Sequence, residues 1–427
     1  MKYAFQLLFI LLSLTSLGFA KNGIPLNPIV SESLGVDIHF TTPQPGEMEE
    51  LAAAGIRWVR MDFFWQETEH VKGQYDFSAY DRLLGALDPY HIRPILIFCY
   101  ANPLYDHGLS PHTPAGREAF ARWAAAAARH FRGRGVVWEM YNEPNGYFWK
   151  PKRNDGDYIK LALAVGEALK ENTPDATYIG PAGAMIDLGF LKECFMAGLL
   201  NYWDAVSVHP YRQRVPESTA KEYAELRKLI ATYAPKGKSI PIIAGEWGYP
   251  GTWLWPGMSN TLQANLLARE FLSDLAEGVP LTIWYDWRND GTDPNNQEAN
   301  FGLVEFPYQK GKGPVFKPKP AYFALQTLAR ALSGYRFSKR FAIGGPQDYI
   351  LLFTRAQEQR LVIWTAAWQP HQITIRGARG RFAVTDVEGR QLRPLHARRH
   401  ELKITLTDAP KYLTPQKVGG FTNVVHR

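Results

Sequence analysis

Residues 136–149 read VVWEMYNEPNGYFW. The first half of this stretch is apolar, β-branched and aromatic, which is typical of a strand buried on both faces of a parallel sheet. The strand-like run ends on Asn142 and Glu143, and Pro144 follows as a chain breaker. The stretch therefore predicts a buried strand that presents an amide and a carboxylate at one edge of a sheet.

Seven other runs have the same texture, and helix-like stretches with apolar residues at three- and four-residue spacing separate most of them. Their ranges are 34–40, 56–64, 93–101, 176–183, 204–211, 240–247 and 281–287. Eight strand–helix units of this length predict a closed (β/α)₈ TIM barrel. An open, doubly wound sheet is the alternative, but no glycine-rich nucleotide turn follows any of the early runs.

The pattern changes at about residue 336. Short alternating segments separated by turn residues follow, which predicts a small C-terminal antiparallel β-sandwich over 336–427. The catalytic barrel is then expected over 21–335. Residues 1–20 combine Lys2, an apolar core and small residues at Gly18 and Ala20, the pattern of a cleaved secretory signal peptide.

The signal peptide predicts a secreted or periplasmic protein with no membrane span after cleavage; an uncleaved N-terminal anchor is the alternative. Only Cys99 and Cys194 are present, and two buried free thiols are favoured over a bridge or a metal site. The net charge is +7, and residues 371–403 hold eight Arg or Lys against three Asp or Glu. A basic surface can attract anionic polymers, but no motif indicates nucleic-acid binding.

Catalytic groups of a TIM barrel lie at the carboxyl ends of its strands. The fourth run ends on Glu143 and the seventh on Glu246, so the two carboxylates are expected to face each other across the barrel mouth. Paired carboxylates perform glycoside hydrolysis: a separation of about 5–5.5 Å supports a covalent intermediate, and a wider one admits a water. Either glutamate alone has a simpler interpretation as a salt-bridged strand end.

Other strand ends supply supporting groups. Arg60 would hold a nearby carboxylate ionised, Asn142 would donate to a sugar hydroxyl, and His209 and Tyr211 would point into the mouth, with Tyr211 donating to Glu246. Trp284 would give a flat floor for a pyranose ring. Taken singly, Arg60 has an alternative as a core ion pair and His209 as a buried structural histidine.

Aromatic residues are 13% of the chain, and sugar rings pack their CH faces on aromatic planes. Four tryptophans are therefore predicted subsite residues, with some expected to be core instead: Trp65 after the second run, Trp247 at the end of the seventh, and Trp253 and Trp255 after it.

Asn-Glu-Pro at 142–144, His-x-Tyr at 209–211, Glu246 and Trp284 together resemble the clan A retaining glycoside hydrolases. The resemblance covers the whole barrel and is closer to family 39 than to family 5, whose members usually have a histidine at the end of the third strand, where this chain has Cys99 and Tyr100. It implies that Glu143 is the acid/base and Glu246 the nucleophile.

The sequence thus predicts a secreted, monomeric, retaining β-glycosidase that acts on a poly- or oligosaccharide without a metal or organic cofactor. Two alternatives stay open: a non-catalytic carbohydrate-binding barrel, and a transglycosylase that uses the same covalent intermediate.

Overall fold

The computed structural model describes residues 23–24, 26–213, 215–252 and 258–421. The predicted signal peptide and the tryptophans at 253 and 255 lie outside these residues. Eight parallel strands form a closed barrel in chain order, which confirms the predicted fold. They are β1 (Leu34–Asp37), β2 (Trp58–Phe64), β3 (Arg93–Cys99), β4 (Val137–Met140), β5 (Thr177–Ala184), β6 (Val206–His209), β7 (Ile242–Trp247) and β8 (Thr282–Trp284).

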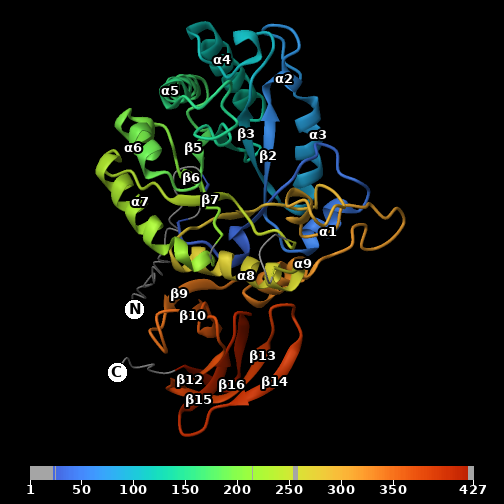
Figure 1. Ribbon diagram of the computed structural model, residues 1–427, viewed down its shortest axis with the longest axis vertical. Coiled ribbons are helices and arrows are strands. Elements are labelled where there is room, and N and C mark those ends of the chain that lie inside the picture. Colours follow the sequence, from blue (N-terminus) through green and yellow to red (C-terminus); the bar gives the residue numbers. More distant parts are fainter. Residues whose placement is uncertain (1–22, 25, 214, 253–257, 422–427) are drawn as a thin grey trace, which may run out of the picture.

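Helices surround the barrel in the alternating order that the sequence predicts (Figure 1). They are α1 (Glu47–Ala53), α2 (Trp65–Thr68), α3 (Ser78–Leu87), α4 (Pro114–His130), α5 (Asp155–Asn172), α6 (Leu188–Met196), α7 (Ala220–Tyr233), α8 (Asn260–Ala276) and α9 (Pro320–Ala331). Capping residues fix several starts: Thr113 accepts from the Gly116 N–H, and Ser259 accepts from the Leu262 N–H.

The barrel interior is layered. An apolar layer near the amino ends of the strands contains Trp58, Ile95, Val137, Ile179, Ile243 and Ile283. Two residues further along β2 and β4, the interior side chains are Arg60 and Glu139, both buried. Because side chains alternate along a strand, these polar groups form the next layer, directly beneath the barrel mouth.

The remaining strands form the antiparallel C-terminal domain: β9 (Arg336–Arg340), β10 (Asp348–Arg355), β11 (Glu358–Thr365), β12 (His371–Arg376), β13 (Ala378–Thr385), β14 (Gln391–His396), β15 (Glu401–Leu406) and β16 (Lys411–Phe421). A six-stranded sheet, in the order β14-β13-β16-β11-β10-β9, and the β12-β15 pair enclose one apolar core. The predicted sandwich is therefore confirmed.

The C-terminal domain lies against α8 on one side of the barrel (Figure 1). Its Tyr349, Leu351 and Trp364 belong to the same apolar cluster as the barrel helices, so the core continues across the contact. Both cysteines are free and buried, as expected.

Candidate active site

A pocket of about 840 Å³ opens at the carboxyl ends of the barrel strands. Of the predicted site residues, Arg60, Asn142, Glu143, Tyr211 and Glu246 line it, and His209 is buried directly behind Glu143. One carboxylate oxygen of Glu143, one of Glu246 and a ring nitrogen of His209 lie within 4.8 Å of one another. The structure thus brings the two glutamates together, although 103 residues separate them in the chain.

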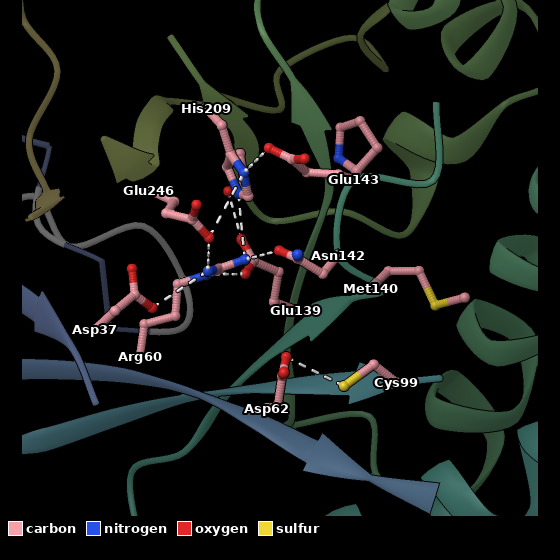
Figure 2. Close-up of polar contacts among 12 residues, drawn as sticks. Asp37, Arg60, Asp62, Cys99, Glu139, Met140, Asn142, Glu143, His209 and Glu246 are labelled. Carbon is pink, nitrogen blue, oxygen red and sulfur yellow. Dashed lines mark hydrogen bonds and ion pairs between the residues drawn. The ribbon is translucent and has the colours of Figure 1, made fainter. Parts of the chain in front are cut away.

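Arg60 is the centre of this arrangement (Figure 2). Its Nε donates to Glu139 at 2.5 Å, and its Nη1 donates to Asp37 at 3.2 Å and to Glu246 Oε2 at 2.7 Å. Its Nη2 contacts Asn142 Oδ1 at 2.7 Å and His209 Nε2 at 3.2 Å. A guanidinium has five N–H donors, and all five are used here.

The contact with Arg60 assigns the His209 tautomer. Arginine can only donate, so His209 Nε2 accepts and the ring proton of the neutral imidazole sits on Nδ1. Nδ1 then donates to Glu143 Oε1 over 3.0 Å. Burial lowers the pKa of His209 to about 4, which keeps the ring neutral. With Oε1 already accepting, a proton on Glu143 belongs on Oε2.

Burial also raises the pKa of Glu143, although the positive charge of Arg60 opposes the shift. A carboxyl group with a raised pKa suits a general acid. The backbone of Glu143 is held at a φ of 43°, in the left-handed region that is uncommon for this residue type. Its N–H donates to Ala182 O at 2.9 Å, so β5 fixes the turn that aims the side chain.

Glu246 has a different environment. The Tyr211 hydroxyl donates to Oε1 at 2.9 Å, and Arg60 donates to Oε2. Both carboxylate oxygens are therefore held in place by hydrogen-bond donors. The two glutamates therefore have different surroundings. Glu143 is desolvated beside the neutral ring of His209, and Glu246 accepts hydrogen bonds from the Arg60 guanidinium and the Tyr211 phenol.

A register shift between Ala244 and Trp247 on β7 explains why Glu246 reaches the pocket. Interior side chains alternate along a strand, so Ile243 and Gly245 would be followed inward by Trp247. The irregularity reverses this order, and Trp247 is buried in the core while Glu246 lines the pocket. At Gly245 an added Cβ would lie 2.1 Å from Ser207 Oγ, so a larger residue there would have to displace the Ser207 side chain.

Three predicted subsite tryptophans need correction, because Trp65, Trp247 and Trp284 are 0–1% exposed and none of them lines the pocket. Trp65 begins α2 and stacks on Tyr105, with ring centroids 4.9 Å apart. Trp284 packs in the core, and its Nε1 donates to Phe301 O at 3.2 Å. The next residue, Tyr285, lines the pocket instead.

Several lining residues were not predicted. These are Asp37, His39, Asp62, Tyr100, Tyr285 and Glu298, among others. Asp37, His39 and Asp62 lie in the middle or near the ends of the predicted runs 34–40 and 56–64, as Arg60 does, so the reasoning that located Arg60 could have located them as well. Glu298 lies on a long loop after β8, where the sequence gives no such signal.

Among the described residues there are two groups in which three potential metal-ligand atoms lie close together. One is Glu143, His209 and Glu246. The other is His39, Asp286 and Asp290, in which His39 Nε2 lies 3.5 Å from Asp286 Oδ2. Burial lowers the pKa of His39, but the hydrogen bond and charge of Asp286 outweigh it and raise that pKa to about 9. The protonated imidazole forms an ion pair with the Asp286 carboxylate.

Comparison of the sequence with family models and with curated proteins gives no match. Solved structures do match. A family 39 glycoside hydrolase from the gut symbiont Bacteroides cellulosilyticus WH2 is similar with a TM-score of 0.77 and 25% identity, over 93% of this chain and 82% of that one.

Two further structures share the fold. A family 39 enzyme from Xanthomonas axonopodis pv. citri gives a TM-score of 0.64 at 16% identity, over 93% of this chain and 96% of that one. A family 39 β-xylosidase from Caulobacter crescentus gives a TM-score of 0.66 at 16% identity, over 91% of this chain and 97% of that one. With two glutamates facing each other at the mouth of the shared barrel, the chain is a glycosidase whose structural neighbours are family 39 glycoside hydrolases.

Proposed function

We propose that this glycosidase is a retaining β-glycoside hydrolase that cleaves a poly- or oligosaccharide by double displacement. The observation that carries the proposal is the approach of the Glu143 and Glu246 oxygens to within 4.8 Å. Retaining enzymes hold their carboxyl groups about 5–5.5 Å apart, and inverting enzymes hold them about 6.5–9.5 Å apart to admit a water.

In the first step Glu246 attacks the anomeric carbon, and Glu143 transfers its proton from Oε2 to the departing glycosidic oxygen. A glycosyl ester on Glu246 forms as the glycosidic bond breaks. Arg60 and Tyr211 hold the attacking carboxylate in one orientation, which keeps it in line with the reacting carbon.

In the second step Glu143, now ionised, removes a proton from a water that attacks the same carbon. The ester bond breaks, Glu246 is released as a carboxylate, and the sugar leaves with its original anomeric configuration. The scheme needs two carboxyl groups and no cofactor.

The N-terminal sequence supports secretion or export to the periplasm as part of this proposal. Within the part of the chain that the structure describes, no helix has both the length and the apolar character that a membrane span requires. We further propose that the protein acts as a monomer.

An activated 2-fluoro aryl glycoside tests the mechanism. The fluorine slows both steps, because both have oxocarbenium-like transition states, and the good leaving group speeds only the first, so the glycosyl-enzyme accumulates. Mass spectrometry of the digested protein should find one glycosyl adduct, on the peptide that contains Glu246. Proton NMR of early products should show the retained anomer. An inverted product, or an adduct elsewhere, would refute the assignment.

The same incubation separates the alternatives. A transglycosylase would give products longer than the substrate, and a carbohydrate-binding barrel would bind an oligosaccharide without yielding any product. The Glu246→Gln variant is the control for hydrolysis that does not use this site.

A further inference from the structure

Asp62 lies on β2, two residues beyond Arg60 and therefore one interior step closer to the barrel mouth. It lines the pocket together with Arg60, Tyr100 and the two glutamates. The mechanism above gives it no role. Figure 2 shows it below the Arg60 network, joined to Cys99.

The hydrogen bonds of Asp62 are incomplete. Oδ1 accepts from the Cys99 thiol at 3.3 Å and from the Tyr100 hydroxyl at 3.4 Å, and a thiol is a weak donor. Within the described part of the chain, no donor is recorded for Oδ2. Arg60 cannot supply one, because its five N–H groups have other partners.

A carboxylate in this position needs a donor. Burial raises the pKa of Asp62, and the charge of Arg60 opposes that shift without making a hydrogen bond. Asp62 is half-buried and lines the pocket, so its Oδ2 is open to whatever fills the pocket, and a ligand that donates can replace water there. A sugar hydroxyl is such a donor.

The charges around the pocket restrict which sugar can enter. Five lining side chains are carboxylic: Asp37, Asp62, Glu143, Glu246 and Glu298. The basic lining side chains in the described residues are Arg60, Arg212 and His39, and each already faces a carboxylate. Arg212 donates to Glu222 at 2.9 and 3.2 Å, and His39 pairs with Asp286. A sugar carboxylate or sulfate would meet like charge and no free cation.

We infer that Asp62 is a positioning residue that accepts a hydrogen bond from one hydroxyl of an uncharged sugar unit, and that the pocket selects neutral glycans over those with uronic acid units at the cleaved residue. The inference rests on the proposed function of the same site. It is independent of the positive charge of residues 371–403, which belongs to the C-terminal domain.

The test uses the full-length mature protein and the aryl β-glycosides of xylose, glucose, galactose, mannose and glucuronic acid, as mono- and disaccharides. Wild type is expected to cleave at least one neutral substrate and to leave the glucuronide intact. Turnover of the glucuronide at the rate of the matching glucoside would overturn the inference.

Asp62→Asn is then compared with Glu118→Gln, which removes an exposed carboxylate from α4, remote from the pocket. Asp62→Asn should lower kcat/KM for the best neutral substrate by about 10- to 100-fold, as expected for a hydrogen bond to a charged group. Glu118→Gln should leave it unchanged.

A series of monodeoxy analogues distinguishes positioning from structural damage. With the wild-type protein, one deoxy analogue should have a kcat/KM that is lower by a similar factor. With that analogue, Asp62→Asn should not lower kcat/KM further, because both changes remove the same contact. Additive losses with every analogue would refute the contact.

Failure of the proposed function is seen separately, because wild type would then cleave none of the glycosides. The role of Asp62 could still be tested by binding. Calorimetry would measure the Kd of the neutral disaccharides and of their deoxy analogues for wild type and Asp62→Asn. Additive losses in Kd would refute the contact there too.

Discussion

The Tyr211 hydroxyl lies 2.9 Å from Glu246 Oε1, and the Tyr211 side chain is half-buried at the wall of the pocket. Burial, followed by the negative charge of Glu246, holds the pKa of this phenol well above its usual value. Tyr211 therefore remains protonated at neutral pH, and the carboxylate keeps one fixed donor on Oε1.

Replacing Tyr211 with Phe removes that partner and little volume. A hydrogen bond to a charged group contributes about 1.5–3 kcal/mol, so kcat/KM should fall by about 10- to 150-fold. Steady-state hydrolysis of one aryl glycoside measures the effect. Tyr308→Phe is the matched control, because it also removes a tyrosine hydrogen bond, to Pro45 O, outside the pocket. Equal activity of both variants would remove Tyr211 from the site.

Glu143→Gln should depend strongly on the leaving group. A poor leaving group needs the proton of Glu143, and general acid catalysis contributes about 10²–10⁴-fold, so an alkyl glycoside should lose activity by that factor. A dinitrophenyl glycoside leaves without a proton, so its glycosylation step should be slowed much less. Pre-steady-state bursts measure the glycosylation step. Glu246→Gln is the control, because it should lose activity on both the alkyl and the dinitrophenyl glycoside.

The pH profile of kcat/KM should change in the same variant. Burial raises the pKa of Glu143, so the alkaline limb of wild type should lie above the value of about 4.3 for a free glutamate side chain. His209, with a pKa of about 4, is neutral throughout that limb and does not produce it. The alkaline limb should disappear in Glu143→Gln. A limb that persists would assign the proton to another group.

The raised pKa of Glu143 also predicts a gain in stability on substitution. The folded protein binds this proton more tightly than the unfolded chain, so stability falls as the pH rises through the folded pKa. Above both pKa values each unit of the shift destabilises the folded state by about 1.4 kcal/mol. Glu143→Gln should therefore raise the Tm at pH 7, and the gain should shrink toward pH 4.

Circular dichroism melts at the two pH values measure this difference. Glu118→Gln, at an exposed position, controls for the loss of any carboxylate. A variant that is less stable than wild type at pH 7 would show that the hydrogen bond from His209 outweighs desolvation.

The sequence was sufficient for the architecture and for the two facing glutamates with their immediate hydrogen-bond partners. Eight apolar runs separated by helical repeats predicted a parallel barrel, and a barrel brings strand ends together. Glu143 and Glu246 could therefore be paired without any knowledge of contacts, and Arg60, Asn142, His209 and Tyr211 were located by the same rule.

The tryptophans predicted at the ends of β7 and β8 do not line the pocket, because a shift of one residue along a strand decides which side chain faces it. A strand side chain changes face with a shift of one residue. The irregularity on β7 buries Trp247 and exposes Glu246 to the pocket, and at the end of β8 the lining residue is Tyr285, not Trp284. Neither shift leaves a mark in composition or periodicity.

Trp364 of β11 links the C-terminal domain to the barrel through a buried ion pair. Glu217 receives two hydrogen bonds from Arg269 of α8, at 2.7 and 2.8 Å, and a third from the Trp364 indole. Trp364→Phe keeps a ring to stack on Tyr349 but removes the third donor. The loss of a hydrogen bond to a charged group should destabilise the protein by about 1.5–3 kcal/mol.

None of Glu217, Arg269 and Trp364 lines the pocket, so kcat/KM of Trp364→Phe should equal that of wild type at a temperature where both are folded. Urea unfolding followed by circular dichroism measures the stability. Trp368→Phe is the matched control, because Trp368 is 93% exposed in the same domain and should change neither quantity. If Trp364→Phe were as stable as wild type, the ion pair would not couple the two domains; a loss of activity without a loss of stability would instead connect the C-terminal domain to catalysis.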